Sequence, residues 1–325
     1  MPGCSPEEPP PPLVLRIGHP MAPGNNVTLG YEKFKELVER KSEGRILIKL
    51  YPDAVLGNDL TTMNAVQAGE LEMASSSTQN LADISRAFIA IDLPYITRPE
   101  NLGALYASLD QGDLGSYLEA AARSAGLKPI MWSDYGYRNF ATISRRLRAP
   151  GDAAGLRLRT TQSPVDIAIA EALGARPVPL IWADTYPALL RGSIDGESNT
   201  YSLLYTAQHY EVLGHVTETR HTYSMHALMM NLAYWNGLDE ESRRLLAEAA
   251  REALAYERSI TRESEQAARR RMLDYGLAVT ELTDRELEAW REALRPVLDK
   301  FREEADPELV RIIRRTQLEG GRDNQ

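Results

Sequence analysis

An arginine at the end of a strand-like run is the residue in this sequence best suited to bind a small anion. Arg159 closes the run Gly155-Leu156-Arg157-Leu158-Arg159. Its guanidinium is always charged, and its planar fork of N–H donors matches a carboxylate in geometry and charge. Ligand clefts of α/β proteins open at strand ends, so Arg159 is a candidate carboxylate-binding residue. Arg157 lies on the same side of the strand, so at most one of the two reaches a cleft. The alternative for a lone arginine is a surface salt bridge.

Asn199 is the second candidate binding residue. The turn that precedes it, from Gly192 to Gly196, is bounded by glycines, which tolerate a positive φ, and the next short strand would carry Asn199 to the same opening. An amide both donates and accepts hydrogen bonds, which suits a carboxylate oxygen or a hydroxyl. The alternative is an asparagine that caps a turn. In the helix expected between the two candidates, Asp184 suits the N-cap and Pro187 suits the first turn.

No other pattern of side chains indicates catalysis or a metal site. The histidines are His19, His209, His215, His221 and His226, and the last two do not have the i, i+4 spacing of a helical metal site. Nucleophile-elbow, dinucleotide-binding and phosphate-loop motifs are missing from the sequence. The carboxylates show no spacing that selects a catalytic pair. We therefore expect no cofactor, no metal ion and no enzymatic activity.

The length and the charge of the chain limit its class. Its 325 residues suit two lobes of roughly 150 residues each. Asp and Glu outnumber Lys and Arg by 46 to 37, and the net charge of −9 argues against nucleic-acid binding. An anionic ligand must therefore be captured by locally placed cations. No apolar run approaches the roughly 18 residues needed to cross a bilayer.

The N-terminal segment reads as a tether. Cys4, the only cysteine, excludes an intramolecular disulfide and is followed by four consecutive prolines that favour a semi-rigid polyproline II spacer. A cysteine before such a spacer resembles the mature start of a lipid-anchored exported protein, and the alternative is an unmodified surface thiol. No charged and apolar leader precedes Cys4, so a signal peptide is either absent or already removed.

Short apolar runs alternate with helical patterns along the chain, which predicts an α/β fold with a parallel or mixed sheet. The strand-like runs of the first half cover residues 13–18, 45–51, 72–77, 90–94 and 127–132. A change of composition after Trp132 marks a first crossing into a second lobe, and the apolar run around residues 224–231 marks a return. Residues 238 to about 275 predict one long helix, and further helices follow to residue 316.

Several motifs resemble the DctP-type solute-binding proteins of TRAP (tripartite ATP-independent periplasmic) transporters. They include Leu50-Tyr51-Pro52 followed by Leu56-Gly57, the tripeptide Leu93-Pro94-Tyr95, and the segment from Gly155 to Asn199. The similarity extends from about Leu13 to about Thr316. The sequence differs from the family pattern at Asp184, where glutamate is usual, and in Glu197-Ser198, where the family has Gln-Glu.

This resemblance implies a two-lobed, periplasmic-binding-protein-like (type II-like) fold with a long helix bridging the lobes. Residues 1–12 are then a tether, residues 13–134 and about 224–264 form lobe I, and residues 135–223 and about 265–325 form lobe II. The implied function is capture of an organic acid by hinge closure and its delivery to the small and large membrane subunits of a TRAP permease. We expect a periplasmic monomer, tethered to the membrane if Cys4 is lipidated. The alternative is the binding domain of another importer or of a sensor protein.

The resemblance also implies a set of substrate-binding residues. It assigns the carboxylate clamp to Arg159 and places Arg138 and Trp182 against the same solute, although Trp182 suits a core position equally well. It adds polar residues of the first lobe, and His19 in the loop after the first strand reads as a residue of the cleft mouth. The expected binding residues are Arg159, Asn199, Arg138, Trp182, Ser77, Gln79, His19 and Asp59. The identity of the organic acid does not follow from these residues.

Overall fold

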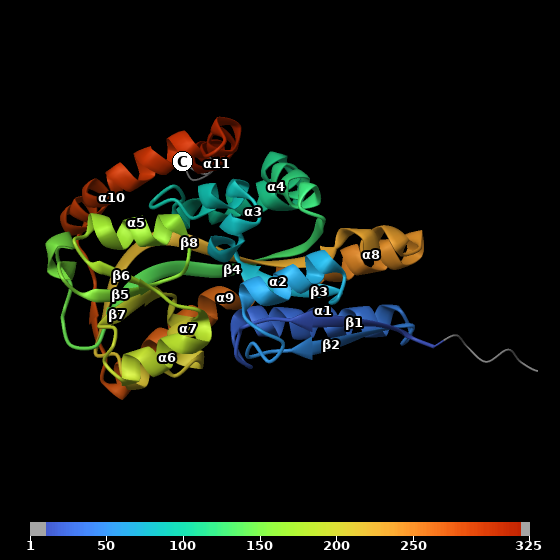
Figure 1. Ribbon diagram of the computed structural model, residues 1–325, viewed down its shortest axis with the longest axis horizontal. Coiled ribbons are helices and arrows are strands. Elements are labelled where there is room, and N and C mark those ends of the chain that lie inside the picture. The colour runs from blue at the N-terminus through green and yellow to red at the C-terminus, as the bar shows by residue number, and fades with distance from the viewer. Residues whose placement is uncertain (1–10, 320–325) are drawn as a thin grey trace, which may run out of the picture.

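One continuous mixed sheet joins both halves of the molecule (Figure 1). The computed structural model describes residues 11–319, so Cys4 and the predicted tether lie almost wholly outside the described residues. The strand order is β2-β1-β3-β8-β4-β7-β5-β6, and β9 pairs with β8. The strands are β1 (Leu13–Gly18), β2 (Ile46–Tyr51), β3 (Met73–Ser77), β4 (Leu127–Thr142), β5 (Arg157–Thr160), β6 (Arg176–Pro179), β7 (Gly196–Asn199), β8 (His215–Asn231) and β9 (Ala278–Thr280).

Helices cover both faces of this sheet. The α-helices are α1 (Asn26–Lys41), α2 (Asp59–Ala68), α3 (Leu102–Gln111), α4 (Asp113–Ser124), α5 (Pro164–Ala172), α6 (Trp182–Leu190), α7 (Tyr201–Thr206), α8 (Leu232–Gly237), α9 (Glu240–Tyr275), α10 (Asp284–Glu304) and α11 (Pro307–Glu319). Short 3₁₀ helices connect them: η1 (Thr78–Asp83), η2 (Arg86–Ile91), η3 (Pro99–Asn101), η4 (Pro150–Ala153) and η5 (His209–Glu211). The predicted α/β architecture is confirmed.

Each half has its own small group of parallel strands. In the first half β1 pairs in parallel with β2 and β3, and in the second half β5 pairs in parallel with β6 and β7. Two long antiparallel strands, β4 and β8, run through both halves and pair with each other. Their pairing is interrupted by register shifts between Asp134 and Gly136 and between Arg138 and Phe140. These irregularities lie where the chain crosses between the lobes.

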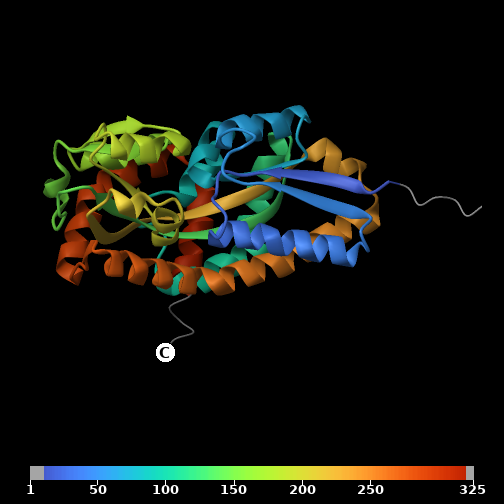
Figure 2. The ribbon, with the colours of Figure 1, turned by 90° about the horizontal axis from the view of Figure 1, so that it is seen from below.

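The long helix α9 lies along both lobes (Figure 2). It begins after Asp239, whose side chain accepts a hydrogen bond from the Ser242 amide at 2.7 Å, and it ends at Gly276 in a left-handed conformation (φ 115°). A helix of 36 residues is about 54 Å long. It contacts α1 of the first lobe and α7 of the second. The predicted helix that bridges the lobes is therefore confirmed.

Two predicted elements differ from the structure. Residues 90–94, predicted as a strand, belong instead to η2 and the turn after it, because Phe88 and Ile91 are buried against the core rather than paired in the sheet. The strand predicted over 127–132 continues to Thr142, so the change of composition after Trp132 marks a crossing within one strand and not an end. The C-terminal α11 packs on α3 and α4.

Two buried carboxyl groups, Asp134 on β4 and Glu257 on α9, lie close together beside the register shift between Asp134 and Gly136. Glu257 Oε2 accepts a hydrogen bond from the Asp134 amide at 3.0 Å, and Glu257 Oε1 accepts one from Asn26 Nδ2 at 2.9 Å. Burial, and then the nearby Asp134 carboxylate, raise the pKa of Glu257 to about 8. Burial also raises the pKa of Asp134. The folded protein therefore holds protons here that the unfolded chain releases.

This buried pair predicts that the protein loses stability as the pH rises. An unfolded glutamate has a pKa near 4.5, so between about pH 5 and pH 8 the unfolded state binds fewer protons than the folded state. The free energy of unfolding then falls by up to about 1.4 kcal/mol per pH unit for each proton retained. The free energy of unfolding, measured with urea at pH 5, 6.5 and 8, should depend less steeply on pH in Glu257→Gln than in the wild type. Glu263→Gln, an exposed position on the same helix, is the control and should keep the wild-type slope.

Candidate functional site

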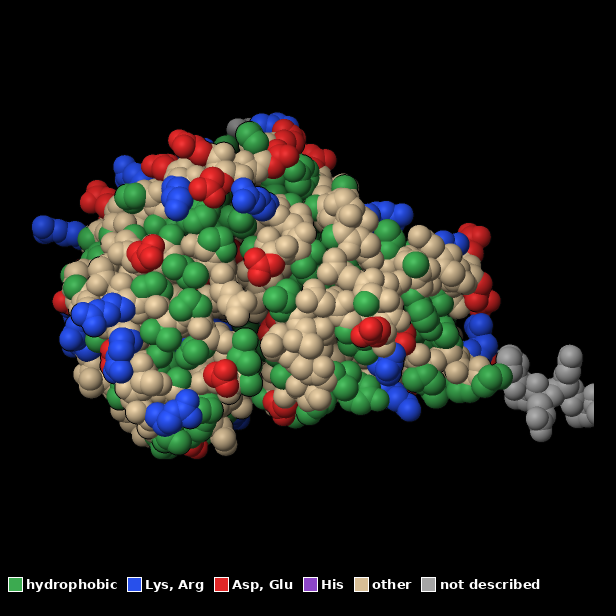
Figure 3. Space-filling view, in the orientation of Figure 1, with side chains coloured by type: hydrophobic (Ala, Val, Ile, Leu, Met, Phe, Trp, Pro, Cys, Tyr) green, Lys and Arg blue, Asp and Glu red, His purple; other side chains and the backbone are tan. Residues whose placement is uncertain are grey.

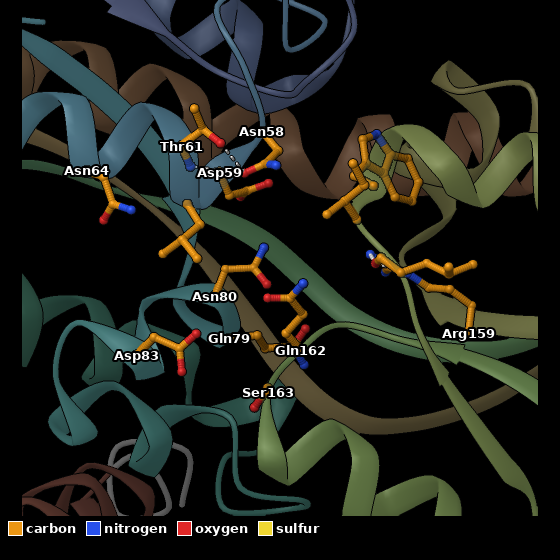
Figure 4. Close-up of a pocket in the computed structure, with 14 residues that line it drawn as sticks. Asn58, Asp59, Thr61, Asn64, Gln79, Asn80, Asp83, Arg159, Gln162 and Ser163 are labelled. Atoms are coloured by element: carbon orange, nitrogen blue, oxygen red, sulfur yellow. Dashed lines mark hydrogen bonds between the residues drawn. The ribbon is translucent and has the colours of Figure 1, made fainter.

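A polar cavity of about 150 Å³ lies between the two lobes (Figure 4). The first lobe contributes α2 and η1, and the second contributes the end of β5, the loop before α5, and the start of α6. A deeper pocket of about 20 Å³ continues from it toward β4 and β7. Asp59, Asn80, Arg159 and Trp182 line both spaces. On the face seen in Figure 3, a narrow furrow separates the two halves of the molecule.

Arg159 lies in this cleft on β5 and is only 6% exposed. Its Nε and Nη2 donate to the Leu180 carbonyl at 3.2 and 2.8 Å, which holds the guanidinium in place. Among the described residues no carboxylate forms a salt bridge with it. Arg157, by contrast, pairs with Asp195 at 2.6 Å on the exposed side, so only one of the two arginines reaches the cleft.

The electrostatics of Arg159 favour an anionic ligand. Burial lowers the pKa of its guanidinium, the nearby Arg138 lowers it further, and Glu197 opposes both effects. A buried cation without a paired carboxylate is costly unless a counter-charge arrives. A ligand carboxylate in the cavity would supply that counter-charge.

Trp182 forms one wall of the cavity at the N-terminus of α6. Its ring lies 5.7 Å from the Arg159 guanidinium carbon and stacks on His209, with ring centroids 4.7 Å apart. It is therefore a cleft residue rather than a purely internal one. The predicted N-cap is wrong. The helix already begins at Trp182 after Ile181, so Asp184 lies within its first turn and Pro187 lies inside the helix. Asp184 still interacts favourably there with the helix dipole.

Asn199 lines the inner pocket at the end of β7. Its Nδ2 donates to Glu197 Oε2 at 2.9 Å, and the other oxygen of Glu197 is hydrogen-bonded to His209 Nδ1. Burial alone would raise the pKa of Glu197, but His209, Arg159 and Asn199 together lower it below the ordinary value. β7 lies close to β4 because residue 196 is a glycine, where a Cβ would overlap the Ala141 carbonyl.

Arg138 also lines the inner pocket, on β4. It is 3% exposed, and its guanidinium donates to the carbonyl and, at 3.3 Å, to the hydroxyl of Ser198. It therefore ties β4 to β7 and adds positive charge to the floor of the cleft.

The first lobe brings three of its four predicted residues to the cleft. Asp59 and Ser77 line the inner pocket and Gln79 the outer cavity. Asp59 Oδ1 accepts hydrogen bonds from Ser76 Oγ at 3.1 Å and from the Ser77 amide at 3.3 Å.

His19 is not at the cleft mouth, which corrects the prediction. It is 1% exposed, its ring lies edge-on to Tyr31, and it does not line either cavity. Burial, followed by the nearby His226, lowers its pKa to about 4, so it is a neutral core residue.

Sequence reasoning missed much of the polar lining. The missed residues include Asn58, Asn64, Asn80, Asp83, Tyr135, Gln162 and Ser163. Gln162 and Ser163 directly follow the strand that ends near Arg159, and that position was a usable signal. Asn64 lies within a helix and gave none.

The described residues, 11–319, contain no cluster of three or more His, Cys, Asp or Glu side chains placed to hold a metal ion. None of the helices in that part of the chain is long and apolar enough to cross a membrane.

Two lobes that share a polar, arginine-bearing cleft and are joined by crossing strands define a solute-binding protein of the periplasmic-binding type. The model of bacterial extracellular solute-binding protein family 7, DctP, matches residues 17–304, and the chain belongs to this family. Its members are the extracytoplasmic solute-binding subunits of TRAP transporters, as the sequence predicted.

Individual relatives agree with this assignment. The C4-dicarboxylate-binding periplasmic protein DctP of Rhodobacter capsulatus is 31% identical over 310 residues, which cover 95% of this chain and 92% of that protein. A TRAP solute-binding protein from Ochrobactrum anthropi is 33% identical with a TM-score of 0.84, over 96% of this chain and 97% of that one. Another, from Roseobacter denitrificans with bound β-D-glucuronate, is 26% identical with a TM-score of 0.87, over 93% and 99% of the two chains.

Proposed function

We propose that this protein captures an organic acid in the interlobe cleft and passes it to a TRAP permease with small and large membrane subunits. The observation that carries the proposal is the buried Arg159, which lines the cavity without a carboxylate partner among the described residues. Two relatives support the ligand class, because one is named for C4-dicarboxylates and the other was solved with β-D-glucuronate. All of these ligands carry a carboxylate.

The proposed mechanism is hinge closure at the crossing strands. Arg159, Trp182 and Asn199 belong to the second lobe, whereas Asp59 and Gln79 belong to the first. A ligand that contacts both sets binds the closed state more tightly and shifts the population toward it. Closure also removes water from the ion pair, which strengthens the attraction between carboxylate and guanidinium. The bulges of β4 near Gly136 (φ 96°) are the expected hinge.

A thermal-shift screen over an organic-acid library, with amines and uncharged sugars for comparison, tests the proposal. A ligand at 100 times its dissociation constant stabilises the folded state by about 2.7 kcal/mol, so the melting temperature of the protein should rise by several degrees. The solute should be recovered chemically unchanged, because we expect a carrier and not an enzyme. A screen in which amines or uncharged sugars raise the melting temperature and carboxylates do not would refute the proposal. The protein should elute as a monomer with and without ligand.

A further inference from the structure

Apart from Arg159, the polar side chains that line the cavity are acids, amides and hydroxyls (Figure 4). Asp59 and Asp83 lie on the first-lobe side, while Arg159 lies across the cavity on the second. Asn80 and Gln162 lie between them. Among the described residues that line this outer cavity, Arg159 is the sole cation. The cavity therefore offers a strong site for one carboxylate and none for a second.

Several acceptors in the cleft lack a hydrogen-bond donor. Gln79 Oε1 and Asn199 Oδ1 are buried without a partner among residues 11–319. The Asn199 amide cannot simply be reversed, because its Nδ2 donates to the Glu197 carboxylate at 2.9 Å. At Asp59 the described residues supply hydrogen bonds to Oδ1 only. Buried acceptors without donors are costly, so a tight ligand should bring donors to these atoms.

The chemistry of these acceptors discriminates between classes of organic acid. A ligand hydroxyl can donate to a carboxylate or to an amide oxygen, whereas an ionised carboxylate can only accept. In the outer cavity, a second ligand carboxylate beside Asp59 or Asp83 would meet like charge, and Arg159, the sole cation of that lining, is already paired with the first carboxylate. An unsubstituted alkyl chain would leave the acceptors without partners. Arg138, the other cation of the cleft, lies deeper and donates to Ser198.

We propose that the solute is a polyhydroxylated monocarboxylate whose carboxylate pairs with Arg159. Its hydroxyl groups donate to Asp59, Gln79 and Asn199. Asp59 is the specificity-determining residue, because its charge attracts hydroxyl donors and repels a second carboxylate. The inference rests on the proposed function, since it takes the Arg159 clamp as given.

Calorimetric titration of the full chain with matched acids tests the inference. The six-carbon series is D-gluconate, hexanoate and adipate, and the four-carbon series is L-threonate, butyrate and succinate. Within at least one series, we expect the hydroxylated monocarboxylate to bind at least tenfold more tightly than the other two acids. A dicarboxylate or an unsubstituted acid that binds as tightly as its hydroxylated counterpart in both series overturns the inference and leaves the carboxylate clamp intact. If none of the six acids binds, the proposed function itself fails for solutes of this size.

The variant Asp59→Asn tests the assigned residue. Its amide oxygen can still accept from Ser76 and Ser77, so the fold should be kept, as circular dichroism would verify. We expect the affinity for the preferred hydroxylated acid to fall at least tenfold. The ratio of this affinity to the affinity for the matched dicarboxylate should also decrease. Asp274→Asn, at an exposed position on α9 outside the cavity lining, is the matched control and should leave both values unchanged. If this ratio of affinities were unchanged in Asp59→Asn, Asp59 would not be the specificity-determining residue.

Discussion

Replacing Arg159 by lysine should abolish most ligand binding even though the charge is kept. The Leu180 carbonyl accepts hydrogen bonds from Nε and Nη2 of Arg159, which hold the guanidinium in place. The remaining N–H groups of the guanidinium are then available to a carboxylate. A lysine ammonium is a single point of charge. It cannot donate to the Leu180 carbonyl and to both oxygens of a carboxylate in the geometry of a planar guanidinium. We expect a loss of about 2–5 kcal/mol, which is roughly a 30-fold or greater rise in Kd measured by calorimetry.

Arg157→Lys is the matched control for this prediction. It makes the same change two positions away on the same strand, where the side chain is paired with Asp195 and 41% exposed. Exposed ion pairs contribute about 0–1 kcal/mol, so this variant should bind as the wild type does. Equal affinities of the two variants would show that Arg159 does not hold the carboxylate.

The sequence was sufficient for the elements with strong periodicity and clear ends. The long α9 was predictable because a continuous helical pattern runs from Asp239, at its N-cap, to Gly276, at its C-cap. The segment at 90–94 was not, because a short apolar run is equally compatible with a buried 3₁₀ turn and with a strand. The extent of β4 was hidden for another reason. Its bulges break the alternation of side chains, so one crossing strand reads as two segments.

The candidate site was predictable where chemistry and position coincide. Arg159 is a forked cation at a strand end, and the structure places it in the cleft, although its role there stays a prediction. His19 has polar chemistry and a loop position, yet the chain folds it against Tyr31, and no local pattern signals that burial. Gln79 Oε1 and Asn199 Oδ1 are buried without a hydrogen-bond donor among the described residues. Their burial depends on contacts between segments that are distant in the sequence. Sequence therefore indicated the anion site and several polar residues around it, and only the fold revealed which of their oxygens lack a hydrogen-bond donor.

Replacing His209 by phenylalanine should destabilise the protein more than any surface change. His209 and Glu197 are 2% and 0% exposed, and a carboxylate can only accept, so His209 Nδ1 must carry the proton between them. Phenylalanine keeps the aromatic stacking on Trp182 and Tyr186 but removes the donor. Removing one partner of a buried charged pair costs about 3–5 kcal/mol, and here Glu197 stays buried with Asn199 as its remaining side-chain donor among the described residues.

The loss can be assigned to the charge by a second substitution. Glu197→Gln in the His209→Phe background removes the unpaired charge, so urea unfolding should recover a large part of the lost free energy. The loss in the single variant should also be smaller at pH 5 than at pH 8, because protonation of Glu197 relieves the same penalty. Tyr186→Phe, which removes only an exposed hydrogen bond to Glu211, should change stability by less than about 1 kcal/mol. If the double variant were no more stable than His209→Phe, lost packing would be the cause rather than a buried charge. Asn199 donates to the same carboxylate, so we expect ligand affinity to fall with stability in the single variant.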